Sequence, residues 1–300
     1  MAVFQDGTIA GTIGGGAVER LAQGHASELL GGRRKQGVRT FQLYPNGGED
    51  IGMICGGEVT VVFQTLRPAD LPLVEQICIR QESRTQSWLV MAIEEQSIRI
   101  GIWGEGDSDW KIPGISQARV APLLGRNTAL EPGSPALFIK PLAQQGMVYI
   151  FGAGHVGREL VWLLDRVGFR VAVVDDRSQV LEAEQFPTGV QLILGDFGRI
   201  DLPLTESDYV VIMTAGHQGD LTILEQILPT PVTYIGCIGS RRKAAATQKL
   251  LKEKGFTEEQ ISRIHSPIGL PIGGETPAEI AVSVAAELIA HRAGKETRHG

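Results

Sequence analysis

The second half of the chain alternates short apolar runs with longer stretches of helical periodicity. The apolar runs predict strands at residues 147–151, 170–174, 191–194, 209–213 and 232–235. Helical stretches lie between or after most of them, at 155–167, 221–228, 241–254 and 257–263. Short strands without polar alternation, separated by helices, indicate a parallel sheet that is buried on both faces. A final helix is predicted from Pro277 to about Arg292, because Thr276 and Glu279 form a capping box around Pro277.

The first half reads as a smaller mixture of helices and strands. A short hairpin is predicted over residues 2–9, a helix over 17–30, and strands over 40–44 and 58–66. A second helix over 71–80 and a hairpin of 88–93 with 97–103 follow. Residues from about 104 to 144 contain several prolines and little periodicity, so they are expected to form an irregular linker.

A glycine motif connects the first strand of the second half to its helix. Gly152 would allow a tight turn, Gly154 would let the backbone approach a pyrophosphate, and Gly157 would let the helix pack on the sheet. The next strand ends at Asp175, which could accept hydrogen bonds from a ribose. His155 could face the phosphates or cap the helix. The alternative is the same fold without a working nucleotide site.

These patterns together predict an α/β protein. Its C-terminal domain, residues 145–300, is expected to be a Rossmann-like parallel sheet. Its N-terminal domain, residues 1–144, is expected to be a mixed α+β unit that ends in the irregular linker.

Two further glycine-containing turns follow later strands of the predicted sheet. Gly216 and His217 follow one strand, and Gly239, Ser240 and Arg241 follow the next. Ligands of open α/β sheets bind at these carboxyl ends, so both turns are candidate anion sites. The plainer interpretation of the second turn is a solvated basic helix start. The loop over 265–276, rich in Pro and Gly, could be a ligand lid or a structured connection.

The N-terminal half has candidates of its own. Three consecutive glycines, Gly14, Gly15 and Gly16, precede a predicted helix in a geometry that suits an anion. Cys55 lies beside Gly56 and Gly57, and an exposed thiol on such a loop could react or bind a soft metal. The plainer interpretation is a buried, inert cysteine.

Composition narrows the class of protein. The formal charge of −6 over 300 residues argues against nucleic acid as a partner. Three cysteines, at spacings that match no zinc pattern, favour a reducing cytoplasm. No apolar run approaches the roughly 18 residues that a membrane span needs.

Several segments in this order resemble the XdhC/CoxI family of accessory proteins, which mature molybdenum hydroxylases such as xanthine dehydrogenase. They are 11–19, 55–57, 151–157, 174–177, 214–217, 235–243 and 265–277, so the resemblance covers nearly the whole chain. Family members usually begin further upstream than Met1, and many carry an arginine before the position of Gly216. These two departures lead us to expect a missing N-terminal segment and an altered anion contact.

The resemblance implies that the chain binds molybdenum cofactor, promotes its sulfuration with a cysteine desulfurase, and delivers it to an apo-hydroxylase. It implies a homodimer. It makes Cys55 a candidate molybdenum contact, and it adds Asp176 to Asp175 as a cofactor-binding candidate. Two alternatives remain open from the residues: an NAD(P)-dependent oxidoreductase, motivated by the glycine motif and Asp175, and a nucleotide-sensing regulatory module without chemistry.

Overall fold

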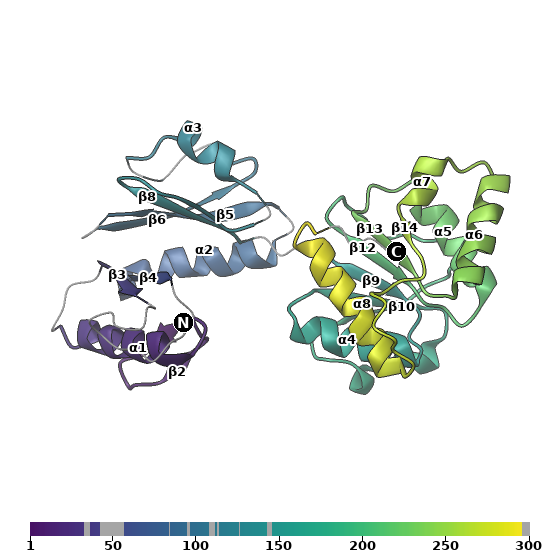
Figure 1. Ribbon diagram of the computed structural model, residues 1–300, viewed down its shortest axis with the longest axis horizontal. Helices are drawn as coiled ribbons and strands as arrows, with labels where there is room; N and C mark the ends of the chain where they lie inside the picture. Colours follow the sequence, from purple (N-terminus) through teal and green to yellow (C-terminus); the bar gives the residue numbers. More distant parts are fainter. Residues whose placement is uncertain are drawn as a thin grey trace. The chain divides into compact units, whose positions relative to one another are not determined.

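The computed structural model describes residues 1–32, 37–42, 57–83, 85–94, 97–107, 112, 114–125, 127–142 and 146–295. The chain divides into two compact units, residues 1–144 and 145–300 (Figure 1). Each unit has its own sheet and its own buried core. The α/β class that the sequence predicts is confirmed.

One parallel sheet organises the C-terminal unit. Its strands in the described residues are β9 (Val148–Phe151), β10 (Val171–Asp175), β11 (Gln191–Leu194), β12 (Tyr209–Ile212), β13 (Tyr234–Cys237) and β14 (Ile264–His265). They lie in the order β11-β10-β9-β12-β13-β14, and each neighbouring pair is parallel. Numbered along the chain, this order is 3-2-1-4-5-6, the Rossmann arrangement. The predicted parallel sheet is confirmed.

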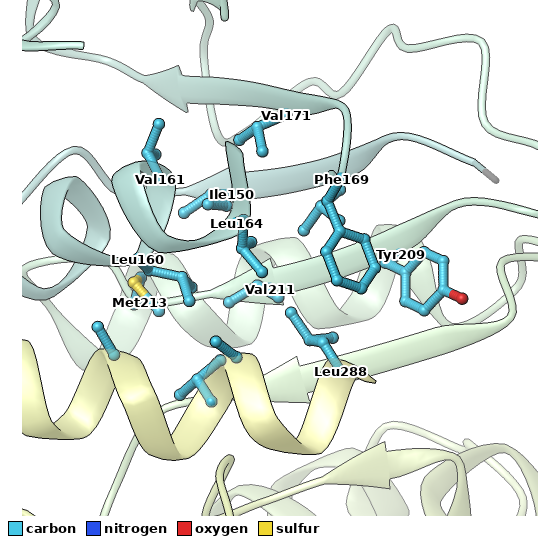
Figure 2. Close-up of a cluster of buried hydrophobic side chains, with 14 of the residues drawn as sticks. Ile150, Leu160, Val161, Leu164, Phe169, Val171, Tyr209, Val211, Met213 and Leu288 are labelled. Carbon is cyan, nitrogen blue, oxygen red and sulfur yellow. The ribbon is translucent and has the colours of Figure 1, made fainter. Parts of the chain in front are cut away.

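Helices cover both faces of this sheet, as the unalternating strands predict. They are α4 (His155–Arg166), α5 (His217–Ile227), α6 (Arg241–Glu253), α7 (Glu258–Ser262) and α8 (Pro277–Arg292), with 3₁₀ turns at Ser178–Val180 and Ala183–Gln185. Side chains of α4 and α8 share one buried cluster, which Figure 2 shows with Leu160 and Leu288 facing the strands. Side chains of α5, α6 and α7 form the cluster on the other face.

Strand β9 illustrates why both faces are apolar. Its residues alternate between the two clusters, with Val148 and Ile150 on the α4 and α8 side and Tyr149 and Phe151 on the other. Since successive side chains of a strand point to opposite faces, a strand between two helical layers must be apolar throughout.

The N-terminal unit contains an antiparallel sheet of four strands within the described residues. These are β5 (Ser87–Ile93), β6 (Ile98–Gly104), β7 (Ala129–Glu131) and β8 (Ala136–Pro141), in the order β6-β5-β8-β7. The hairpin of β5 and β6 was predicted, but β7 and β8 lie in the stretch expected to be irregular. That expectation was wrong, because β8 supplies Leu137 and Ile139 to the buried core of this unit. A short helix, α3 (Gln117–Val120), and a 3₁₀ turn at Ala121–Leu123 lie in the same stretch.

The remaining N-terminal elements are short strands and two longer helices. They are β1 (Ala2–Val3), β2 (Ile9–Ala10), α1 (Gly16–Leu30), β3 (Gly37–Gln42), β4 (Glu58–Phe63), a 3₁₀ turn at Pro68–Asp70 and α2 (Leu71–Glu82). Strands β1 and β2 pair with each other, as do β3 and β4, both antiparallel. None of the helices in the described part of the chain is long and apolar enough to cross a membrane.

Candidate functional site

The glycine motif after β9 has three glycines in three different environments. A Cβ on Gly152 would lie 2.4 Å from the carbonyl oxygen of Met213, and its φ is +116°, so the turn requires glycine. A Cβ on Gly157 would lie 2.2 Å from the carbonyl oxygen of Gly152, so α4 packs closely on the turn. A Cβ on Gly154 would meet nothing within 4 Å. The backbone at Gly154 is therefore the part of the motif that a ligand can approach.

The helix starts on either side of the sheet's switch point share one feature. Strand order reverses between β9 and β12, and these strands lead into α4 and α5. The N-cap residues are Gly154 and Gly216, and no described side chain caps either helix. The first N–H groups of a helix need acceptors, and the helix dipole favours an anionic one. Both starts therefore suit a phosphate.

His155 and His217 are the first residues of α4 and α5. His155 is exposed and makes no capping bond, so of its two sequence-based interpretations the capping role is wrong. His217 stands at the predicted position beside Gly216.

Asp175 lies at the end of β10 and is 1% exposed. Its Oδ2 accepts hydrogen bonds from the Ala153 amide at 2.7 Å and from Nη2 of Arg177 at 3.0 Å. Its Oδ1 accepts from the amide and from Nε of Arg177, at 3.0 and 2.9 Å. Burial raises the pKa of Asp175, but these hydrogen bonds outweigh burial and leave the pKa below 3.8. The carboxylate holds the glycine turn and Arg177 in place.

Asp176, the next residue, has a side chain that is 53% exposed. Its Oδ1 lies 3.8 Å from Nε of Arg177. The two carboxylates that the sequence predicts as ligand acceptors therefore differ in exposure: Asp175 is buried, and Asp176 faces solvent.

The turn after β13 is built differently from the turns after β9 and β12. The hydroxyl of Ser240 accepts a hydrogen bond from the Lys243 amide and caps α6. Arg241 begins the helix and is exposed. A Cβ on Gly239 would lie 2.9 Å from Cδ of Lys243. Because a side chain already caps this helix, its start offers less to an anion than the starts of α4 and α5.

A buried ion pair links these turns, and the motifs in the sequence did not predict it. Nζ of Lys243 lies 2.5 Å from Oδ2 of Asp220, a carboxylate that is 1% exposed. Oδ1 of Asp220 accepts from the hydroxyl and the amide of Thr214, at 2.6 and 3.1 Å. The pair ties the turn after β12 to the first turn of α6. The sequence does place Asp220 in the first turn of α5 and Lys243 in the first turn of α6, and the ion pair could have been predicted from that placement.

Cys237, the last residue of β13, lies beside this ion pair and is 4% exposed. Burial, and secondarily the charge of Asp220, raise the pKa of its thiol to about 12. Such a thiol is protonated at neutral pH and unreactive.

A second buried carboxylate, also not predicted, anchors the Pro- and Gly-rich loop. Glu287 on α8 is fully buried and accepts hydrogen bonds from the Gly269 amide and, at 2.8 Å, from Nδ1 of His265. The ring of His265 stacks on Tyr234 at 4.5 Å between centroids. At the far end of the loop, Thr276 and Glu279 form the predicted capping box of α8. The loop is therefore held at both ends, which favours the interpretation as a structured connection.

The three N-terminal glycines have positive φ angles: +116° at Gly14, +74° at Gly15 and +72° at Gly16. Three amides of this turn, those of Ile13, Gly14 and Gly15, already donate to side chains of the same segment. Oε2 of Glu19 accepts from the amides of Ile13 and Gly15, at 2.9 and 3.1 Å, and from the hydroxyl of Thr12. These hydrogen bonds lower the pKa of Glu19, and the bond from the Thr12 hydroxyl has the largest effect. The chain supplies its own anion at this helix start.

The remaining N-terminal candidates, Cys55 and Gly56, lie outside the described residues. Gly57 precedes β4 with a φ of +121°. Over the described ranges, no group of three or more His, Cys, Asp or Glu side chains is placed to hold a metal ion.

The carboxyl edge of the C-terminal sheet thus brings together most of the predicted site. Gly154, Asp176 and Gly216 follow its adjacent strands β9, β10 and β12. The open space at Gly154, the starts of α4 and α5, and the exposed carboxylate of Asp176 are features that suit the phosphates and the ribose of a nucleotide.

Comparison with known proteins finds a matching family model at each end of the chain. Residues 148–288 match the XdhC Rossmann domain, and residues 1–42 match the XdhC and CoxI family. A solved structure described as a xanthine dehydrogenase from Bacillus halodurans superposes with a TM-score of 0.72 at 23% identity, covering 99% of this chain and 87% of that one. This likeness shows that the fold extends over both units.

Among curated proteins, YqeB of Escherichia coli is 35% identical over 160 residues, which are 52% of this chain and 29% of YqeB. A probable xanthine dehydrogenase component of Bacillus subtilis is 34% identical over 158 residues, 52% of this chain and 46% of that protein. The chain therefore spans less than half the length of these two relatives. The molybdenum cofactor insertion chaperone PaoD of Escherichia coli is 24% identical over 296 residues, 99% of this chain and 78% of PaoD. The family models at the two ends of the chain agree with the resemblance seen in its motifs, and the chain belongs to the XdhC and CoxI family.

Proposed function

We propose that this protein is a maturation factor for a molybdenum hydroxylase of the xanthine dehydrogenase type. It takes up molybdenum cofactor as cargo and passes it to the apo-hydroxylase. The observation that carries the proposal is the similarity to a molybdenum cofactor insertion chaperone over 99% of this chain. The probable xanthine dehydrogenase component among the relatives supports the choice of hydroxylase.

The cargo site in this proposal lies in the N-terminal unit. Cys55 supplies a thiolate to the molybdenum, and Gly56 and Gly57 let the cofactor approach the backbone. A thiolate is a ligand that suits a soft metal centre. Gly14, Gly15 and Gly16 play a smaller part than the sequence suggests, because Glu19 already accepts from their turn.

The rest of the proposed cycle involves partners. A cysteine desulfurase supplies the sulfur that the hydroxylase needs on its cofactor, and the maturation factor acts as a homodimer in the cytoplasm. The low cysteine count supports a reducing compartment.

Anaerobic equilibrium binding of purified molybdenum cofactor tests the proposal. We expect saturable binding by the wild-type protein and about tenfold weaker binding by Cys55→Ala, because the molybdenum loses its thiolate ligand. Cys78→Ala is the matched control, since Cys78 is a free and exposed cysteine on α2. Absence of saturable binding, or equal weakening by both substitutions, would count against the proposal.

The two alternative functions differ from this one in their ligand. An NAD(P)-dependent oxidoreductase would turn over NAD(H) or NADP(H), and a nucleotide sensor would bind a nucleotide without turnover. The starts of α4 and α5, which no described side chain caps, favour nucleotide binding, and this is compatible with a maturation factor that carries its cargo elsewhere.

A further inference from the structure

Helix α8 is apolar on its outer side as well as on its inner side. Its inner side contributes Val284 and Leu288 to the buried cluster. On its outer side Val282 is 46% exposed and Ile289 is 38% exposed. The only ionisable residue between Glu279 and His291 is Glu287, which is fully buried. A helix that is apolar all round is ordinarily covered on every side, so the outer face of α8 has the character of a contact surface.

The neighbouring helix shows that the fold itself does not require this composition. Helices α4 and α8 lie side by side on one face of the sheet and share one buried cluster (Figure 1). The exposed residues of α4 include Glu159, Asp165 and Arg166, so α4 presents charges to solvent. Two helices in the same layer therefore have different outer faces, and only that of α8 is uncharged along its middle.

The outer face of α8 reads the same from either end. Val282 lies as far before the midpoint between Ala285 and Ala286 as Ile289 lies after it, and Ala278 and Ala293 are related in the same way. A second α8 laid antiparallel about this midpoint would set Val282 of each copy against Ile289 of the other. Such a surface is self-complementary, as a two-fold symmetric interface requires.

The middle of this face is small enough for two helices to meet. Ala286 is half-buried and exposed Ala278 and Ala293 flank the two larger side chains. The distance between the axes of packed helices depends on the side chains at the contact and falls to about 8 Å where they are small. At that distance Val282 and Ile289 of the two copies would be in contact.

The charges at the two ends of α8 select the antiparallel orientation. Glu275 and Glu279 lie at its start, and Arg292 and Lys295 lie at its end. Glu279 also caps the helix, and Arg292 also donates to the carbonyl oxygen of Val167 at 3.3 Å, but these contacts leave the charges in place. An antiparallel pair brings the acidic end of each copy beside the basic end of the other, whereas a parallel pair brings like charges together. Exposed charges contribute little to affinity, so they set the orientation while the apolar residues supply the binding.

We propose that the outer face of α8 is the interface between two copies of this chain, packed antiparallel about Ala286. The inference rests on the proposed function only in naming the surface for the homodimer, and it does not depend on the cargo. Helix α8 has 16 residues and is about 24 Å long, which is small for a stable interface. The dimer should therefore be of micromolar affinity, with a dissociation constant of about 10 µM.

Sedimentation equilibrium of the full-length protein between about 1 and 100 µM tests for the dimer. In Val282→Glu we expect dimerisation to weaken by about 100-fold, because each copy would place an unpaired carboxylate against Ile289 of the other. Leu194→Glu is the matched control: Leu194 is 63% exposed at the end of β11, away from α8, and its replacement should leave the dissociation constant unchanged. Both positions are exposed, so neither variant is expected to unfold, and an unchanged thermal midpoint checks this.

Disulfide formation between introduced cysteines tests the orientation. Cys55→Ser and Cys78→Ser first remove the native thiols other than the buried Cys237. A disulfide requires Cα atoms within about 7 Å of each other. A mixture of Val282→Cys and Ile289→Cys proteins should therefore cross-link in a glutathione redox buffer. Val282→Cys alone should not, because the two copies of this position lie seven residues, or about 10 Å, apart along an antiparallel pair.

Three results would overturn the inference: a wild-type protein that stays monomeric at about 100 µM, equal dimerisation of wild type and Val282→Glu, or cross-linking of Val282→Cys alone in preference to the mixture. The first two would mean that another surface or another protein covers α8. Binding of molybdenum cofactor is measured separately. Dimerisation without saturable cofactor binding contradicts the maturation role alone, and cofactor binding by a protein that never dimerises contradicts this inference alone.

Discussion

The packing of α4 on the glycine turn gives a sharp stability prediction for Gly157→Ala. The new Cβ would lie 2.2 Å from the carbonyl oxygen of Gly152 and 3.3 Å from its carbon. Ordinary contacts between such atoms are about 3.5 Å, so the first turn of α4 would have to move by roughly 1 Å. Leu160 and Leu164 oppose that movement because both are fully buried in the cluster that α4 shares with α8.

The expected loss of stability follows from two opposing effects. Overpacking of a close contact costs about 1–3 kcal/mol. Replacement of a helical glycine by alanine recovers up to about 1 kcal/mol. We therefore expect a net destabilisation of about 1–2 kcal/mol in the C-terminal unit.

Urea dependence of amide hydrogen exchange in peptides from α4 and α8 measures this unit separately from the other. Gly154→Ala is the matched control, because its φ of −71° suits any residue and its Cβ would meet nothing within 4 Å. Its cost should stay near the few tenths to about 1 kcal/mol that alanine loses at an N-cap. Equal stability of Gly157→Ala and wild type, or a larger loss in Gly154→Ala, would refute the close packing of α4 on the turn.

Three further predictions concern buried groups. The pKa of Asp175 in the folded protein lies below its unfolded value of about 3.8, so its contribution to stability is present above that pH and is lost as the pH falls through the folded pKa. In Asp175→Asn the decline of stability below about pH 4 should therefore be shallower than in the wild type. Urea titrations at several pH values measure this difference. Cys237, with a thiol pKa of about 12, should resist iodoacetamide at about pH 8 in the folded protein while the exposed Cys78 reacts, and peptide mass mapping that finds equal labelling would contradict this. Glu287→Gln should cost about 1.5–3 kcal/mol in urea unfolding, because the buried charged acceptor of the hydrogen bonds from the Gly269 amide and His265 is replaced by a neutral one; a cost under about 0.5 kcal/mol would contradict the anchoring role.

The glycine turn was predictable because its causes are local. Gly152, Gly154 and Gly157 are separated by a few residues, and each has the environment that its place in the motif predicts. The capping box of α8 was predictable for the same reason.

The partners of the buried charges were not predictable in the same way. Sequence shows an acid at the end of β10, but only the fold shows that Arg177 and the Ala153 amide fill its acceptor sites. Asp220 and Lys243 are 23 residues apart and meet because their helices follow adjacent strands.

Strand length limited the prediction of the sheets. Strand β14 has two residues and β7 has three, too few for an alternating pattern. Strand β8 follows a proline-rich turn, and its residues are placed by pairing with β5 rather than by local sequence.

Transfer of cofactor to an apo-hydroxylase tests the central claim most directly. Purified protein is loaded anaerobically with molybdenum cofactor and mixed with a xanthine dehydrogenase prepared without cofactor, and hydroxylase activity is followed over time. The maturation role requires activity to rise faster and further than with the same amount of free cofactor, and to rise less with Cys55→Ala than with Cys78→Ala. Activation that is no better than with free cofactor would contradict it.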